Sequence, residues 1–233
     1  MARYTLILGT KDWSSWSLRP YMALRAIGAT FEEIVVPLRR GDSRDRIIQY
    51  SQAAKLPVLR IEENGRTTTV WDSLAICETL AERHPEARLW PDDAAARAEA
   101  RSYAAEMHSS FAAMRSQLSM DFARRLPTPA LDDAAKADVA RVIEAWAHAL
   151  EHHGDEDGFL FGRFSIADAM YAPVVSRFVT YGIDTPPIVR GYVERMFALP
   201  AMKDWGNAAQ KEVDAGDGVV LILPRLRERI SAQ

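Results

Sequence analysis

The chain has 233 residues, 48% of them hydrophobic, and a formal net charge of −3 with acidic and basic residues interspersed. Nucleic acids and membrane surfaces require a concentrated basic face, so this balance argues against both as partners. Cys77 is the only cysteine, which excludes an intrachain disulfide and suits a reducing cytoplasm.

The first third of the sequence alternates strand and helix signals. Residues 4–8 form a short β-rich run, and residues 16–27 carry apolar side chains at helical spacing before Gly28. A second β-rich run covers residues 31–36 and is ended by Pro37. This order predicts a βαβ unit with parallel strands and a right-handed connection.

A hairpin and a helix complete this part. A weaker helix is predicted over residues 43–50, and β-rich runs at 57–61 and 67–70 then flank Asn64-Gly65. Asn-Gly between two such runs is the strongest short hairpin signal. With a closing helix over residues 73–83, the predicted order is βαβ-α-ββα.

The composition changes at residues 84–93, where two prolines bracket a tryptophan and the periodicity is lost. This segment is predicted to be a linker between residues 1–83 and an all-helical domain at 94–233. The helices expected there cover residues 94–120, 131–152, a segment opened by Ser165 with Asp168 as a capping box, a segment from Pro186 to about Leu199, and a segment from Pro200 through Trp205.

The two ends of the chain give no membrane signal. Residues 1–4 lead directly into the first strand without the long apolar stretch of a signal peptide. The apolar run at residues 219–223 is too short to span a bilayer. We therefore expect no membrane association.

Pro57 is out of place inside the apolar run 56–61, because proline cannot donate to a sheet ladder. It is tolerated at the first residue of a strand, where it can hold a sharp turn with a cis bond. A cis bond would turn the backbone N–H and C=O of Leu56 outward, within reach of a ligand. Asp72-Ser73 and Ser14-Ser15 add polar groups at two helix starts, so the three places together suggest a site for a small extended ligand.

Four segments within residues 4–212 resemble the cytosolic glutathione S-transferases. Residues 51–59 resemble the family's Asn/Ser-Pro-x-Gly-Lys-Val-Pro-Val-Leu segment, whose proline is cis, and residues 72–76 resemble its Glu/Asp-Ser-x-Ala-Ile helix start. Residues 161–168 and 199–205 resemble its folding cap and a late helix. The resemblance implies an α/β thioredoxin-like N-terminal domain, an all-α C-terminal domain and a cytoplasmic homodimer.

The segment 13–20 resembles the active-site segment of serine-type members and is closest to the zeta-like bacterial ones, which have Ser-Ser-Cys-Ser-x-Arg. Aligning the family arginine with Arg19 places the first serine at Ser14 and the family cysteine at Trp16. The resemblance makes Ser14 the hydrogen-bond donor that stabilises the glutathione thiolate at a helix start. Ser15 is its rival, since a register slip of one residue would exchange the two.

The resemblance also implies glutathione as co-substrate, no permanently bound cofactor and no metal. The backbone of Leu56 beside Pro57 would pair with the cysteinyl part of the tripeptide. Ser73 suits the γ-glutamyl carboxylate, and Asp72 suits its ammonium group. The glycyl carboxylate is assigned to the basic side chains of Lys55, Arg39 and Arg40.

The second substrate is expected to be a small apolar electrophile, as in detoxification by transfer of alkyl or aryl groups to glutathione. Its pocket is assigned to Trp16, Met107, Phe111 and Met114. The last three recur at helical spacing, which is equally typical of core or dimer contacts.

Two other functions stay open on the sequence. One is a glutathione-dependent isomerase of the zeta (maleylacetoacetate isomerase) type, weakened by Trp16 because those enzymes use the segment intact. The other is a non-catalytic binding module with the same fold. Cys77 is predicted to be a core residue, and His148 with His152 a solvated helix face rather than a metal site.

Overall fold

The computed structural model describes residues 2–216, so the apolar run at 219–223 and the rest of the tail lie outside the described residues. The N-terminal part holds one mixed sheet in the order β2-β1-β3-β4. β1 pairs parallel with β2 and antiparallel with β3, and β3 pairs antiparallel with β4. The strands are β1 (Arg3–Gly9), β2 (Phe31–Val36), β3 (Val58–Glu63) and β4 (Arg66–Trp71).

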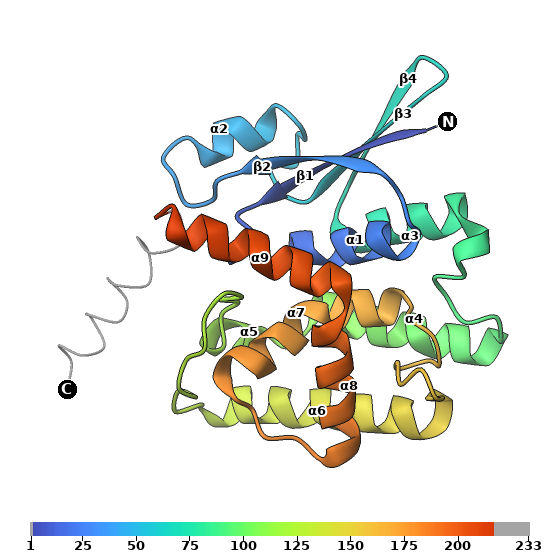
Figure 1. Cartoon of the computed structure of the whole chain (residues 1–233), viewed down its shortest axis with the longest axis vertical. Helices are drawn as coiled ribbons and strands as arrows, with labels where there is room; N and C mark the ends of the chain where they lie inside the picture. The colour runs from blue at the N-terminus through green and yellow to red at the C-terminus, as the bar shows by residue number, and fades with distance from the viewer. Residues whose placement is uncertain (1, 217–233) are drawn as a thin grey trace.

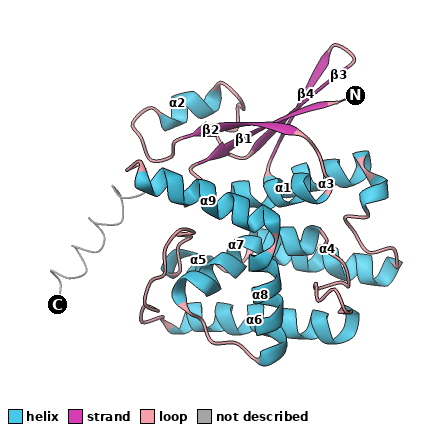
Figure 2. Cartoon of the chain, viewed as in Figure 1, coloured by secondary structure: helices cyan, strands magenta, loops and turns pink. Residues whose placement is uncertain are grey.

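Helices lie on both faces of this sheet (Figure 2). They are α1 (Ser15–Ala26), α2 (Ser43–Ile48) and α3 (Ser73–Arg83). Alternation along β1 sends Leu6 and Leu8 into the core under α1 and α3, whereas Ile7 packs with Ile47 of α2. The predicted order βαβ-α-ββα is confirmed.

The predicted hairpin turn is also confirmed. Asn64 and Gly65 both have positive φ, 51° and 73°, as the favoured two-residue hairpin turn requires.

The C-terminal part is helical, and α9 returns to the N-terminal part (Figure 1). A short 3-10 helix, η1 (Pro85–Ala87), precedes it. The helices are α4 (Ala94–Ser109), α5 (Ala112–Gln117), α6 (Asp133–His153), α7 (Ile166–Tyr181), α8 (Pro187–Ala198) and α9 (Pro200–Asp214). Within residues 2–216, no helix is long and apolar enough to cross a membrane.

The prediction of a single helix over residues 94–120 is wrong, because the helix is interrupted at Ser110-Phe111. Ser110 is extended, and Phe111 has a left-handed backbone with φ 62°. The Asp138 carboxylate on α6 then accepts the backbone N–H of Met114 at 3.0 Å. A contact distant in sequence thus supports the new helix start, and neither glycine nor proline marks it.

One hydrophobic core runs through both parts of the molecule. It joins Leu6 and Leu8 of β1 to α7, whose side chains are almost all buried. Trp205 of α9 is fully buried, and its ring nitrogen donates to the backbone oxygen of Lys11 at 2.9 Å. Cys77 is fully buried as predicted, and burial raises the pKa of its thiol to about 12.

The capping box at the start of α7 is confirmed. The Asp168 side chain accepts the backbone N–H of Ser165 at 2.8 Å and that of Leu160 at 3.1 Å. Asp168 is completely buried, and burial raises its pKa to about 6. It therefore ties the preceding loop to the central helix.

Replacing Asp168 with alanine is expected to lower the free energy of unfolding by about 3 kcal/mol, because two buried N–H groups lose their acceptor. Asp132 is an exposed cap that accepts one N–H, from Ala135 at 2.8 Å, and is the matched control. Asp132→Ala should cost about 1 kcal/mol. Urea unfolding measures both, and equal losses would contradict the assigned role of Asp168.

Candidate functional site

The two predicted serines lie where β1 leads into α1. Ser14 is the N-cap residue of α1, and its hydroxyl donates to Ser17 Oγ at 2.7 Å. Ser17 Oγ also accepts the backbone N–H of Gly9 at 3.1 Å. The Ser15 hydroxyl has no hydrogen-bond partner within residues 2–216. Both serines are less than a tenth exposed, so each would meet a ligand with little competition from water.

The predicted cis bond between Leu56 and Pro57 is present. Pro57 is buried directly before β3, whose first residue, Val58, pairs with Ile7 of β1 and with Trp71 of β4. The backbone of Leu56 makes no hydrogen bond to any other described residue. Leu56 is therefore free to pair with a ligand.

These pairings place the serine segment, the Leu56 backbone and Asp72-Ser73 at one end of the sheet. β1 ends at Gly9 before the serines, β4 ends at Trp71 before Asp72, and β3 begins between them. The sequence alone could not establish this, because the strand order decides which loops are neighbours.

Asp72 has a backbone conformation that is rare for a residue with a side chain, with φ 76° and ψ 134°. Its Oδ1 accepts the N–H groups of Leu74 at 2.9 Å and Ala75 at 3.3 Å, which caps α3. Ser73 is fully buried, and its Oγ accepts from Arg19 Nη1 at 3.4 Å. Strained backbone of this kind is concentrated at ligand sites.

A group of side chains joins this end of the sheet to the helical part, and we call it the junction cluster. Asp72 Oδ2 lies 3.3 Å from Nε2 of His108 on α4. The His108 ring meets the Trp16 ring edge-on, with centroids 5.2 Å apart. Two guanidinium groups lie over the Trp16 ring, that of Arg19 at 4.2 Å and that of Arg115 on α5 at 4.6 Å.

Burial dominates the electrostatics of the junction cluster. It lowers the pKa of Arg19 to about 9, with repulsion from Arg115 and Arg177 adding to the effect. Burial likewise lowers the pKa of Arg115. It also lowers the pKa of His108, against the opposing effect of Asp72, so the neutral imidazole is favoured near neutral pH.

The three basic residues predicted for the glycyl carboxylate are exposed. The Arg39 guanidinium lies 5.3 Å from the ring of Trp13, the residue before Ser14, which puts it beside the serines. Arg40 lies just before α2, where its backbone N–H donates to Ser43 Oγ at 2.8 Å. Lys55 lies in the loop before the cis bond.

Met107, Phe111 and Met114 are buried in the core. Their polar neighbours in sequence, His108 and Arg115, contact Trp16 instead. Sequence reasoning missed both residues. The available signal was that each of them directly follows a methionine that was predicted to line the site, Met107 and Met114.

Sequence models of the N-terminal and C-terminal domains of glutathione S-transferase match residues 13–83 and 94–195. The chain belongs to the glutathione S-transferase family. It is also 34% identical, over 88 residues, to a probable maleylacetoacetate isomerase of Caenorhabditis elegans. That match covers 38% of each chain, well under half of the relative.

Two solved structures are similar over most of the chain. A glutathione transferase homologue from Burkholderia with bound glutathione is 26% identical, covers 90% of this chain and 98% of its own, and has a TM-score of 0.66. A maleylacetoacetate isomerase from Anaeromyxobacter dehalogenans is 26% identical, covers 88% and 95%, and has a TM-score of 0.64. The latter holds dicarboxyethyl glutathione and citrate in its active site.

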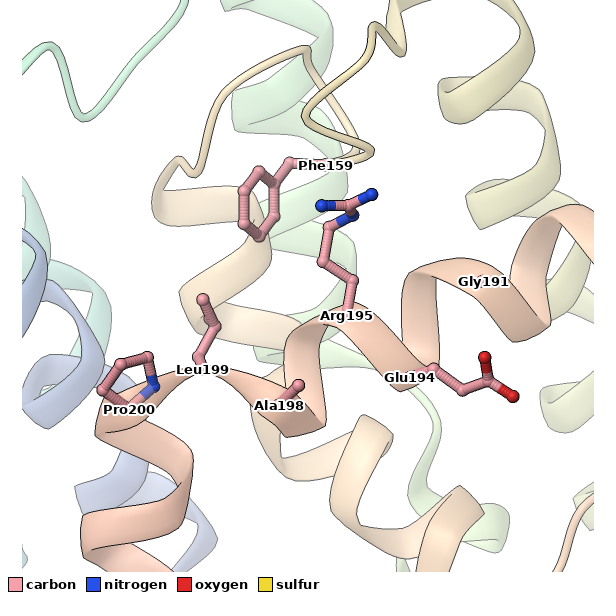
Figure 3. A pocket seen from close by; sticks show the side chains of 7 residues that line it. All are labelled: Phe159, Gly191, Glu194, Arg195, Ala198, Leu199 and Pro200. Carbon is pink, nitrogen blue, oxygen red and sulfur yellow. The ribbon is translucent and has the colours of Figure 1, made fainter.

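Two surface hollows of this family member lie in its helical part, and no predicted site residue lines either. The larger has a volume of about 610 Å³ and is bordered by Phe159, Arg195 and Leu199, among others (Figure 3). The smaller, of about 320 Å³, shares Gly191 and Arg195 with it. Neither hollow is part of the junction cluster.

Asp12 fastens the loop before the serines to the helical part. Its backbone oxygen accepts from Phe122 N at 3.1 Å, and its Oδ1 accepts from Ala123 N at 2.9 Å. Its own N–H donates to Glu212 Oε2 at 3.1 Å. Asp12 is completely buried, and burial raises its pKa to about 6 although the Ala123 hydrogen bond opposes the shift.

The raised pKa of Asp12 predicts that its contribution to the free energy of unfolding depends on pH. Between about pH 4 and pH 6 the folded protein keeps a proton on Asp12 that the unfolded chain has lost, so this contribution to stability falls as the pH rises. Asp12→Asn keeps an acceptor for Ala123 and removes the charge. Its stability relative to the parent should therefore rise by about 2 kcal/mol from about pH 4 to about pH 7. Urea unfolding at both pH values tests this, and a constant difference would contradict it.

Proposed function

We propose that the protein is a glutathione transferase that stabilises the glutathione thiolate at the start of α1 for attack on a small electrophile. The observation that carries the proposal is the convergence of the three polar places. The serine segment, the Leu56 backbone and Asp72-Ser73 lie at one end of the sheet, and Trp16, Arg19 and His108 connect them. The similar structure with bound glutathione supports this ligand.

The chemistry of the site rests on the serines. A free thiol has a pKa of about 8.5, so a donor hydroxyl and the N–H groups of a helix start are needed to favour the thiolate near neutral pH. Ser14 acts by donating a hydrogen bond. A serine hydroxyl is not ionised near neutral pH, so it does not act as the base that removes the thiol proton.

Ser17 supports Ser14 in this role. Hydroxyl hydrogens rotate, so the 2.7 Å contact also permits Ser17 to donate to Ser14 while Ser14 donates to the sulfur. The Gly9 N–H donates to Ser17 in either case. A chain of donors strengthens its last member. Ser15, with its free hydroxyl, remains the rival donor.

The rest of the tripeptide is assigned on the same grounds. The unpaired backbone of Leu56 binds the cysteinyl part, Ser73 binds the γ-glutamyl carboxylate, and Asp72 binds its ammonium group. The contact of Arg39 with Trp13, the residue before Ser14, supports the assignment of Arg39 to the glycyl carboxylate. Lys55 and Arg40 stay candidates for that group.

A glutathione-dependent isomerase is the second candidate. The similarity to two maleylacetoacetate isomerases supports it, and Trp16 at the position of the zeta-class cysteine opposes it. The homodimer and the cytoplasmic location stay predictions from family membership.

Retention on immobilised glutathione and turnover of 1-chloro-2,4-dinitrobenzene test the main proposal. Ser14→Ala should raise the thiol pKa of bound glutathione by about one unit, the equivalent of about tenfold in thiolate population. It should also lower kcat by about 10- to 100-fold, as the loss of a charge-stabilising donor does. The ultraviolet absorbance of the thiolate reports that pKa directly.

Ser15→Ala is the matched control, since it removes the same atoms one residue away. A loss confined to Ser15→Ala would move the donor role to Ser15. A pure protein that neither binds glutathione nor turns over the electrophile is instead a non-catalytic module.

A further inference from the structure

We propose that Arg115 selects electrophiles that carry a carboxylate, by pairing with that group beside the glutathione sulfur. The inference rests on the proposed transferase function and names its substrate class. It differs from the expectation of a purely apolar electrophile drawn from the sequence.

The first observation is that Arg115 is a partly buried charge without an acidic partner. Its one hydrogen bond goes to the backbone oxygen of Ser110 at 3.4 Å, and no carboxylate of residues 2–216 lies within ion-pair distance. Arg141 illustrates the ordinary case, with Glu106 at 2.8 Å. A guanidinium that has lost part of its water and gained no counter-charge is costly, and a bound anion offsets that cost.

The second observation is the excess of positive charge around Arg115. Its guanidinium repels those of Arg19 and Arg177, which lowers the pKa of both, although burial is the larger cause in each case. Arg177 is held by the backbone oxygens of Leu118 at 2.8 Å and Pro173 at 3.0 Å. Asp72 is the acid of the junction cluster, and the proposed function assigns it to the ammonium group of glutathione.

The third observation is the origin of each charge. Arg19 and Ser73 belong to the N-terminal part, and Arg19 Nη1 donates to Ser73 Oγ at 3.4 Å. Arg19 is therefore adjacent to the residue assigned to the γ-glutamyl carboxylate. Arg115 belongs to α5, in the helical part, which supplies the electrophile side of the proposed site. Its contact with the Trp16 ring fixes the direction of the guanidinium before a ligand arrives.

A guanidinium presents two parallel N–H donors that match a carboxylate. His108, held by Asp72 and favoured as the neutral imidazole, adds bulk and a hydrogen-bonding group but little charge. The junction cluster therefore suits an electrophile with one carboxylate, carried on a different atom from the carbon that the sulfur attacks.

The test uses two electrophiles that differ in charge, 4-chloro-3,5-dinitrobenzoate and its methyl ester. In both, the sulfur forms a bond to the ring carbon that bears chlorine, chloride leaves with the bonding electrons, and the thiol proton goes to solvent. Arg115→Met should lower kcat/KM for the acid by about 10- to 100-fold and for the ester by less than about threefold. Arg115→Lys should restore part of the acid rate.

Arg101→Met is the control, because Arg101 also lies over a tryptophan ring, that of Trp90 at 5.5 Å, but outside the junction cluster. It should leave the acid-to-ester ratio unchanged. Calorimetric binding of the two product conjugates gives a second readout that needs no turnover, and Arg115→Met should weaken only the carboxylate conjugate.

Other results overturn the inference in distinguishable ways. An equal loss on both electrophiles with a raised thiol pKa makes Arg115 a thiolate stabiliser, and an equal loss with a raised KM for glutathione makes it part of the glutathione site. Unchanged rates on both remove any role. If the parent protein turns over only the ester, the inference fails and the transferase function stands. If it binds neither conjugate and turns over neither electrophile, the transferase function fails as well.

Discussion

The packing of α1 against α7 is the contact on which the position of Ser14 and Ser15 depends. α1 begins with the serines and is buried along most of its length, and α7 is the central helix of the helical part. One apolar core passes from β1 through both helices. Because closely packed interiors resist small displacements, the serines are held by the whole molecule rather than by their loop alone. Asp12 adds hydrogen bonds between the loop before the serines and the helical part. Because hydrogen bonds are directional, they fix the orientation of this loop in addition to the apolar packing.

Charge is distributed unevenly over this frame. Exposed arginines such as Arg83 and Arg141 pair with glutamates, whereas Arg19 and Arg115 share the neighbourhood of one tryptophan and lack such a partner within residues 2–216. A folded chain tolerates like charges at close range only when other contacts exceed the repulsion. The binding of an anion at this point therefore relieves a cost that folding has already incurred.

Sequence reasoning was strongest where the signal is local. The cis proline, the Asn64-Gly65 turn and the Asp168 cap each depend on a few adjacent residues, and all are present. It failed where a contact distant in sequence decides, as at Phe111, where no local signal marks the break. The residues of α4 and α5 that contact Trp16 are His108 and Arg115, each one position after a predicted methionine. A turn of about 100° per residue separates the buried face of Met107 and Met114 from the face that reaches Trp16.

The return of α9 to the N-terminal part has a consequence for synthesis on the ribosome. Trp205 packs against Tyr21 with ring centroids 5.0 Å apart and donates to the backbone of Lys11. The N-terminal part, which is synthesised earlier, thus lacks one of its covers until α9, the last described helix, has emerged. During that interval Tyr21 presents an apolar surface to the solvent or to a chaperone. The segment that carries the serines is therefore synthesised early, but its packing is completed only after α9 has been synthesised.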